Sequence, residues 1–216
     1  MTRSPFMISR RSVPGVLTLA LAGCAGLFVS PPPKYIFRLT PNSTYPPNLP
    51  HIAAQLLIDV PTAPAALDRR RIALTRSPVS LDYFADSEWA DNLSALVQTA
   101  LLTSFENSGT MTALGREGSG LRADFILTSD IRHFEAEYVA GGSAPTVWVS
   151  IEVMLVAMPR RDIVAQALFE RHIPASADAL PDIVAAFDAA LGAVMREIVV
   201  WTVTNSALSA KRPRVL

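Results

Sequence analysis

Three stretches in the second half of the sequence have the length and the alternation of β-strands: residues 124–138, 147–158 and 163–173. In the middle stretch every second residue, from Val147 to Ala157, is apolar. This period of two places one face of a strand against a hydrophobic core. Residues 159–162, Pro-Arg-Arg-Asp, are typical of a tight turn. The pattern therefore predicts neighbouring antiparallel strands that share a buried face.

The first of these strands changes the face on which its apolar residues lie. They are odd-numbered in its first half and even-numbered in its second half: Phe125, Leu127 and Ile131, then Phe134, Ala136 and Tyr138. One extra residue in a strand produces such a change, because successive side chains point to opposite faces. We therefore expect a β-bulge near Arg132 and His133.

Two longer segments show the three- and four-residue spacing of amphipathic helices. One begins at about Ser87, places Trp89 on its apolar stripe and ends at Gly109. Asp86 or Ser87 is in place to cap its start. The other segment covers about residues 181–207. Each segment predicts a helix with one face on the core.

Shorter strands are expected at residues 54–60, 71–75, 79–83 and 111–114, with a short edge strand at 35–39. The complete pattern predicts an α+β domain with two long amphipathic helices packed on one face of a sheet. We expect that sheet to be largely antiparallel, with a mixed sheet as the alternative.

The N-terminus has the layout of a secretory signal peptide. Three arginines and no acidic residue precede a short apolar stretch that ends in Leu21-Ala22-Gly23-Cys24. These four residues resemble the lipobox of bacterial lipoproteins, and Cys24 is the only cysteine of the chain. In a lipobox the thiol, a strong nucleophile as thiolate, is acylated and becomes the first residue of the mature protein. We therefore predict a signal peptide at residues 1–23 and lipidation of Cys24.

Two other interpretations of this segment stay open. Residues 13–29 form an almost uncharged run, near the lower limit of about 17 residues for a membrane-spanning helix. Pro14, Gly15 and the prolines at 31–33 make it a poor spanning helix. Alternatively, Cys24 is an ordinary apolar residue of a cleavage region. The position of the sole cysteine favours lipidation.

Removal of the signal peptide leaves 16 basic and 19 acidic residues, since three arginines and no acid leave with it. This slightly negative balance lacks the electrostatic signature of nucleic-acid binding. With Cys24 committed to lipid, the folded domain has no disulfide and no cysteine-based metal site. Its stability must therefore come from a core, which a hydrophobic content of 50% makes feasible.

Proline separates the N-terminal region from the domain. Nine of the 17 prolines lie between residues 31 and 64, which predicts an extended segment. We accordingly assign residues 24–52 to the lipidated cysteine and a proline-rich tether with a short strand. Residues 53–209 are expected to form the single α+β domain, and residues 210–216 a basic tail.

The sequence contains no pattern that predicts catalysis or a cofactor. His51, His133 and His172 lack a metal-ligand partner at a recognisable spacing. The glycines around residue 118 lack the lysine and hydroxyl of a phosphate-binding loop. We therefore expect no catalytic, cofactor-binding or metal-binding residues. Trp148 lies opposite the valine face of its strand, and it is our candidate for a partner-binding aromatic residue.

The chain resembles the ABC-type transport auxiliary lipoprotein family in a series of short blocks. The most distinctive is Glu88-Trp89-Ala90-Asp91-Asn92-Leu93. Others lie at residues 34–39, 57–61, 67–73, 81–84, 105–109, 123–127, 131–135 and 185–201. The order and spacing of the blocks, more than any one of them, carry the resemblance. The interval from residue 42 to residue 54 is longer and richer in proline than we expect for the family.

The resemblance implies a non-catalytic, lipid-anchored periplasmic component of a transport system. Its partners would be an ABC permease and ATPase and a protein with an MCE (mammalian-cell-entry) domain. The system would move phospholipid or other hydrophobic compounds between membranes. Ala25 after the cysteine, where an aspartate would retain a lipoprotein in the inner membrane, fits sorting to the outer membrane. An exposed sheet edge or the Trp148 face would be the docking surface.

Two alternatives belong to other functional classes. The first is an outer-membrane assembly or envelope-enzyme activator lipoprotein, which would bind a barrel protein or a peptidoglycan synthase. The second is a lipid-anchored hydrolase, which would need an essential polar cluster. Its candidate residues are His133, His172, Asp124 and Asp130.

Overall fold

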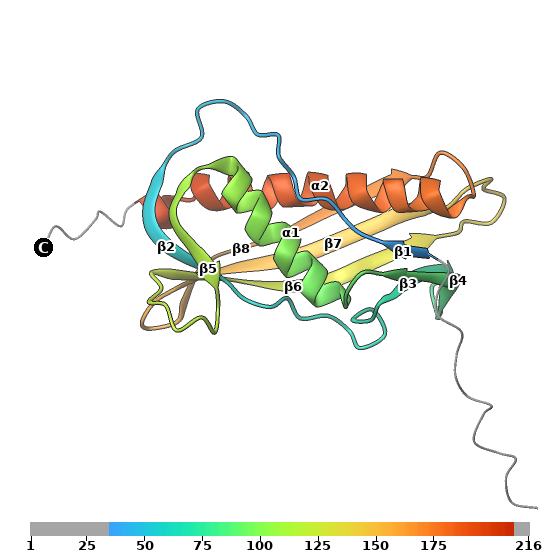
Figure 1. Ribbon diagram of the computed structural model, residues 1–216, viewed down its shortest axis with the longest axis horizontal. Coiled ribbons are helices and arrows are strands. Elements are labelled where there is room, and N and C mark those ends of the chain that lie inside the picture. Colours follow the sequence, from blue (N-terminus) through green and yellow to red (C-terminus); the bar gives the residue numbers. More distant parts are fainter. Residues whose placement is uncertain (1–34, 210–216) are drawn as a thin grey trace, which may run out of the picture. The chain divides into compact units, whose positions relative to one another are not determined.

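The computed structural model describes residues 35–209, so Cys24, Ala25 and the tail at 210–216 lie outside the described residues. Eight strands form one sheet, on which the helices pack (Figure 1). The elements are β1 (Tyr35–Phe37), β2 (Ile52–Ile58), β3 (Arg71–Ser77), β4 (Ser80–Trp89), α1 (Leu93–Ser108), β5 (Met111–Arg116), β6 (Phe125–Glu137), β7 (Thr146–Ala157), β8 (Asp162–Pro174), α2 (Leu180–Thr204) and α3 (Ser206–Ser209).

Strand β6 is the centre of the sheet. Along one side it pairs with β7, which in turn pairs with β8. Along its other side, β2 pairs with its first residues, 125–127, and β3 with its last, 136–137. Thr62 bridges to Asp130 between these two partners. The sheet therefore divides at β6, with β5 beyond β2 at one end, and β4 and β1 beyond β3 at the other.

The sheet is mixed, so the expectation of a largely antiparallel sheet is wrong. Strands β3 and β4, β6 and β7, and β7 and β8 are antiparallel pairs. The pairs β1–β4, β2–β5, β2–β6 and β3–β6 are parallel. Each antiparallel pair is a hairpin, and a hairpin can be predicted locally from the turn residues between its two strands. Each parallel pair joins strands that are not neighbours along the chain, and alternation within a strand does not identify such a partner.

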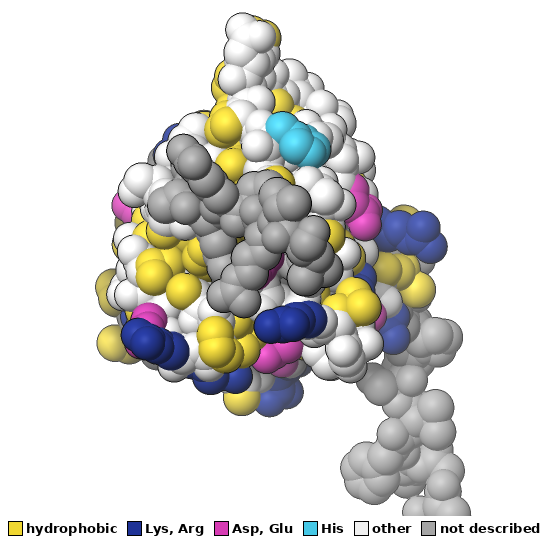
Figure 2. Space-filling view, turned by 90° about the vertical axis from the view of Figure 1, so that its left-hand side faces the viewer, with side chains coloured by type: hydrophobic (Ala, Val, Ile, Leu, Met, Phe, Trp, Pro, Cys, Tyr) yellow, Lys and Arg dark blue, Asp and Glu magenta, His cyan; other side chains and the backbone are white. Residues whose placement is uncertain are grey.

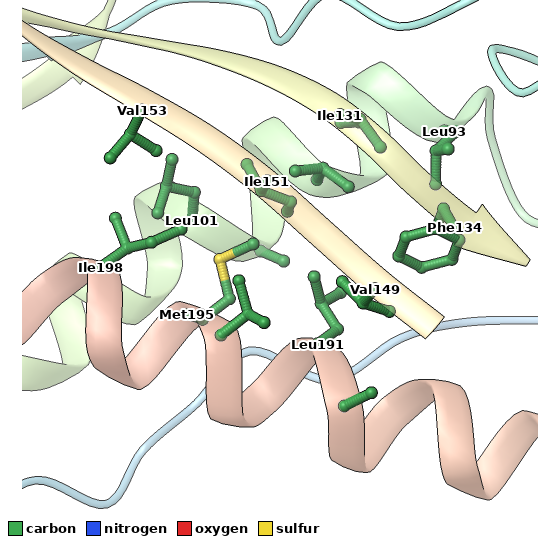
Figure 3. Close-up of a cluster of buried hydrophobic side chains, with 14 of the residues drawn as sticks. Leu93, Leu101, Ile131, Phe134, Val149, Ile151, Val153, Leu191, Met195 and Ile198 are labelled. Carbon is green, nitrogen blue, oxygen red and sulfur yellow. The ribbon is translucent and has the colours of Figure 1, made fainter. Parts of the chain in front are cut away.

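Helices α1 and α2 supply one layer of the core, as predicted. Side chains from α1, α2, β6 and β7 meet in it (Figure 3). The labelled members are all buried: Leu93, Leu101, Ile131, Phe134, Val149, Ile151, Val153, Leu191, Met195 and Ile198. The expected C-terminal helix ends earlier than predicted, at Thr204, and a short third helix follows Asn205.

The first helix begins later than predicted. Ser87 and Trp89 belong to β4, where they pair with Tyr35 and Phe37 of β1. The N-cap of α1 is Asn92, so neither Asp86 nor Ser87 caps it. The reason is tertiary, because pairing with a strand about 50 residues away outweighs the local helical spacing. Gly109 does end the helix, at a φ of 63° that glycine adopts without strain.

Residues 38–51, here called the strap, run across the helical side from β1 to β2 (Figure 1). Asp188 of α2 accepts hydrogen bonds from the backbone N–H and the hydroxyl of Thr40, both at 2.6 Å. The backbone N–H of Asn42 donates to Ser104 Oγ of α1 at 3.0 Å. The strap, which lies within the predicted proline-rich tether, is thus held on both long helices.

Candidate interaction surface

The helices leave one face of β6, β7 and β8 uncovered, here called the outer face. The odd-numbered residues of β7 between Val147 and Leu155 are fully buried in the core. Because side chains alternate along a strand, the even-numbered residues point to the outer face. Trp148 is among them, and it lies opposite Glu135 of β6 and His172 of β8.

The predicted bulge in β6 is confirmed. The register between β6 and β7 shifts between Ile131 and His133, so Arg132 is the extra residue. Core residues are therefore odd-numbered before the bulge and even-numbered after it, ending with Phe134 and Ala136. This shift brings both His133 and Glu135 to the outer face. Their Nδ1 and Oε1 atoms are 2.7 Å apart.

Trp148 lies between two histidines. The His133 ring is nearly parallel to the indole, with ring centroids 3.3 Å apart and an interplanar angle of 10°. The His172 ring, from the strand on the other side of β7, is 4.9 Å away at 26°. The indole is therefore half-buried, and its Nε1 is buried with no hydrogen-bond partner among the described residues.

Glu135 holds this stack in place. Its side chain is only 10% exposed, and a buried carboxylate needs donors to offset its lost hydration. The backbone N–H of Phe134 supplies one at 2.5 Å, and His133 contacts the other oxygen. The carboxylate thus fixes the orientation of the imidazole that covers the indole.

A network of charged and polar side chains lies on the outer face next to the stack. Arg132 Nε is 2.7 Å from Asp130 Oδ2, and its Nη2 pairs with Glu152 of β7. Gln166 of β8 donates to the same glutamate at 2.6 Å. These hydrogen bonds, from Gln166 first and then Arg132, hold the pKa of the Glu152 carboxyl below its usual value. The network therefore links all three strands.

A groove of about 790 Å³ lies beside the stack. Its walls are the turn between β3 and β4, the end of β6, and Trp148. Val79, at the tip of the turn, is 96% exposed. The Arg76 guanidinium lies 4.5 Å above the ring of Tyr138. An apolar groove with a few polar groups at its rim is typical of a binding site.

Tyr138 ties this groove to the loop before α2. Its hydroxyl donates to Asp178 Oδ1 at 2.6 Å. Burial, followed by this hydrogen bond to a carboxylate, raises the pKa of the Tyr138 phenol to about 12. Both factors favour the neutral phenol, which is the form that can donate.

The four residues of the hydrolase alternative do not form one cluster. Asp124 accepts a hydrogen bond from the backbone of Gln55 near the start of β6, and Asp130 pairs with Arg132. His133 and His172 are separated by the indole of Trp148. The carboxylate that does meet His133 is Glu135, which is not among those four candidates. Its signal in the sequence was the spacing, because residues two apart on a regular strand share a face.

Three further observations concern metal binding, membrane spanning and surface charge in the described residues. Residues 35–209 contain no group of three or more His, Cys, Asp or Glu side chains placed to hold a metal ion. No helix among those residues has the length and apolarity needed to cross a membrane. On the end of the domain shown in Figure 2, basic and acidic side chains lie interspersed with hydrophobic ones. Cys24, the predicted lipidation site, lies outside the described residues.

Comparison with known proteins places the sequence among transport-associated lipoproteins. A family model described as "ABC-type transport auxiliary lipoprotein component" matches residues 37–199. An uncharacterised protein of Bradyrhizobium diazoefficiens is 32% identical over 175 residues, which are 81% of this chain. The chain spans only 46% of the length of that relative.

Two solved structures have a similar fold. The crystal structure of a Xanthomonas campestris protein of the DUF330 family matches with a TM-score of 0.76 at 29% identity. The match covers 82% of this chain and 99% of the other. A second uncharacterised protein has a TM-score of 0.55 at 14% identity, over 83% of this chain and 99% of the other. This second likeness concerns the fold alone.

Proposed function

The chain belongs to the ABC-type transport auxiliary lipoprotein family, and from this premise we propose that it is a non-catalytic accessory subunit tethered by lipid at the periplasmic face of the outer membrane. The observation that carries the proposal is the family match across residues 37–199. Because that family is described as auxiliary, ATP hydrolysis and substrate translocation would belong to partner proteins.

The anchor in this proposal is Cys24. It follows an apolar segment with basic residues before it, and it is the only cysteine of the chain. Acyl chains on Cys24 would bind the bilayer with about 0.8 kcal/mol for each buried methylene. Ala25 at the next position supports sorting to the outer membrane. The folded domain would then be held near that membrane and face the periplasm.

The proposed partners are an MCE-domain protein and the ABC permease and ATPase that act with it. Their cargo would be phospholipid or another hydrophobic compound. We assign the partner contact to the groove beside Trp148, because Val79 and Val139 expose 96% and 72% of their surface there. Exposed apolar side chains around a groove are a mark of interaction sites.

Crosslinking in the native bacterium tests this assignment. A photoreactive amino acid replaces Val79 in the full-length lipoprotein, and irradiation should crosslink it to an MCE-domain protein, identified by mass spectrometry. Leu121 is the matched control position, since it is apolar and 60% exposed. It lies on the loop before the start of β6, whereas the groove lies at the end of that strand. Leu121 should give no such product.

Recovery of a barrel protein or a peptidoglycan synthase at Val79 would instead favour the assembly or activator alternative. Absence of an MCE-domain protein from crosslinks at every position tried would contradict the proposal. Alanine variants of His133, His172, Asp124 and Asp130 that leave function intact would remove the hydrolase alternative.

A further inference from the structure

We propose that the open edge of β8, with the groove between β8 and α2, binds an extended peptide segment of a partner protein by strand addition. One apolar side chain of the segment would enter the groove, and an acidic side chain would pair with Arg196. This proposal deepens the proposed function, because it names the kind of segment that the accessory subunit would receive. It concerns a different surface from the groove beside Trp148.

The edge of β8 is long and weakly protected. Among the described residues β8 pairs only with β7, which leaves its other side open. Residues 165–173 pair with β7 in continuous register, after a shift near Val164. Residues 163–169, Ile-Val-Ala-Gln-Ala-Leu-Phe, contain no charge, glycine or proline. Natural edge strands usually carry lysine, proline or irregularities that prevent pairing. Residues 165–169 carry none of these, so this part of the edge is suited to receive a strand.

The groove lies along the helical side of this edge. Phe169 and Arg171 are opposite the buried residues Ile151 and Val149, so their side chains point to the helical side. With residues of α2 and the strap, including Ala193 and Val200, they line a space of about 690 Å³. Phe169 and Trp201 form its aromatic wall, with ring centroids 5.9 Å apart and planes at 70°.

An added strand would reach this groove directly. Paired strands lie about 4.8 Å apart, and alternate side chains of the new strand would point to the helical side. Those side chains would contact Phe169, Trp201 and Val200, whereas the others would lie beside Leu168, which is 54% exposed on the outer face. Backbone hydrogen bonds would give affinity, and the groove would give specificity, as in other strand-addition sites.

The charges of the groove favour an acidic segment. Arg171 already pairs with Glu197 of α2. Arg196 is exposed and makes no ion pair with any described residue. A carboxylate on the added strand would pair with Arg196 through a charge-assisted hydrogen bond. The occupant is therefore an extended segment in which an apolar residue is followed or preceded by an acidic one.

Selection from a displayed library of random 12-residue peptides, on the purified mature chain, tests the proposal. Enriched peptides should alternate apolar residues with others and share an acidic position. Hydrogen exchange with a selected synthetic peptide should show new protection within residues 162–174. Arg196→Glu should weaken its binding by about tenfold to a hundredfold, and Ala193→Leu should weaken it by filling the groove.

Arg122→Glu is the matched control, because Arg122 is an exposed arginine on the loop between β5 and β6. It should bind the peptide like the unmodified chain, and all variants should unfold at the same temperature. Failure to enrich any peptide, or protection in residues 133–148 instead of β8, would overturn the proposal. So would protection of β8 that rises with protein concentration alone, since the occupant would then be a second copy of the chain. The Val79 crosslink is independent of these results, so either proposal can fail alone.

Discussion

Trp89 joins three parts of the fold through a single buried side chain. It is 1% exposed at the end of β4. Its ring meets Phe134 of β6 edge-on at 6.0 Å and Phe187 of α2 at 5.3 Å. Edge-to-face pairs of this kind stabilise a core beyond the area that they bury. The aromatic cluster therefore fixes how α2 sits on the sheet at this end.

Replacing Trp89 with alanine should lower the free energy of unfolding by about 3–5 kcal/mol, because it leaves a cavity among aromatic rings. Trp89→Phe should have a smaller effect, since it keeps one ring. Urea denaturation followed by circular dichroism measures both. Trp148→Ala is the control, because that indole lies on the outer face and is only half-buried. Equal losses for Trp89→Ala and Trp148→Ala would contradict this account of the core.

Tyr138 should make the stability of the domain fall at alkaline pH. Its folded pKa of about 12 is above the ordinary value of 10.0. Between these two values the folded state holds more protons than the unfolded state, so stability decreases as the pH rises. The contribution is fully present below pH 10 and is lost as the pH rises through about 12.

Comparison of unfolding free energies from pH 9 to pH 11.5 checks this prediction. Tyr138→Phe should show a shallower alkaline decline than the unmodified chain. Tyr83→Phe is the control, since its hydroxyl donates to the carbonyl oxygen of Ala66 rather than to a carboxylate. Parallel declines in the unmodified chain and Tyr138→Phe would show that the Asp178 contact does not hold the phenol neutral.

Among the elements, β6 depends most on its bulge. Deletion of Arg132 would remove the extra residue, and a shift of one residue moves side chains to the opposite face. Either His133 and Glu135 would turn into the core, or Ile131 and its odd-numbered neighbours would turn out of it. We expect a destabilisation above about 4 kcal/mol and loss of a cooperative unfolding transition. Deletion of Ser143, in the exposed loop between β6 and β7, should leave the transition cooperative. A cooperative Arg132 deletion variant would show that β6 tolerates either register.

The elements show which parts of the fold the sequence could predict. The hairpins of β6, β7 and β8, the bulge and α2 follow from periodicity and turn residues, which are local. The predicted start of α1 was wrong because Ser87 and Trp89 pair with β1, about 50 residues earlier. The parallel pairing of β2 and β3 with β6 was not predicted for the same reason. Long-range pairing selects partners that local alternation does not encode.

At the scale of the whole molecule, the candidate surface was predicted in part. Trp148 was placed on the outer face from its parity, and that placement is confirmed. Its two histidine neighbours lie on different strands, so only the register of the sheet brings them together. The groove between β8 and α2 exists only because α2 packs beside the edge strand of the sheet. Such a site belongs to the tertiary fold, and no segment of the sequence contains it.

At the scale of the whole molecule, a single substitution at Cys24 should remove the lipid anchor and leave the fold unchanged. Cys24→Ser should abolish labelling by radioactive palmitate in the native bacterium, because a hydroxyl is a much weaker nucleophile than a thiolate. The mature domain carrying the change should unfold at the same urea concentration as the unmodified domain, since residue 24 precedes the core formed within residues 35–209. Gly26→Ser, two residues later, is the control and should keep the label. Palmitate that persists on Cys24→Ser would contradict lipidation at this residue. A shifted unfolding midpoint would show that the N-terminal segment contributes to the fold as well as to the anchor.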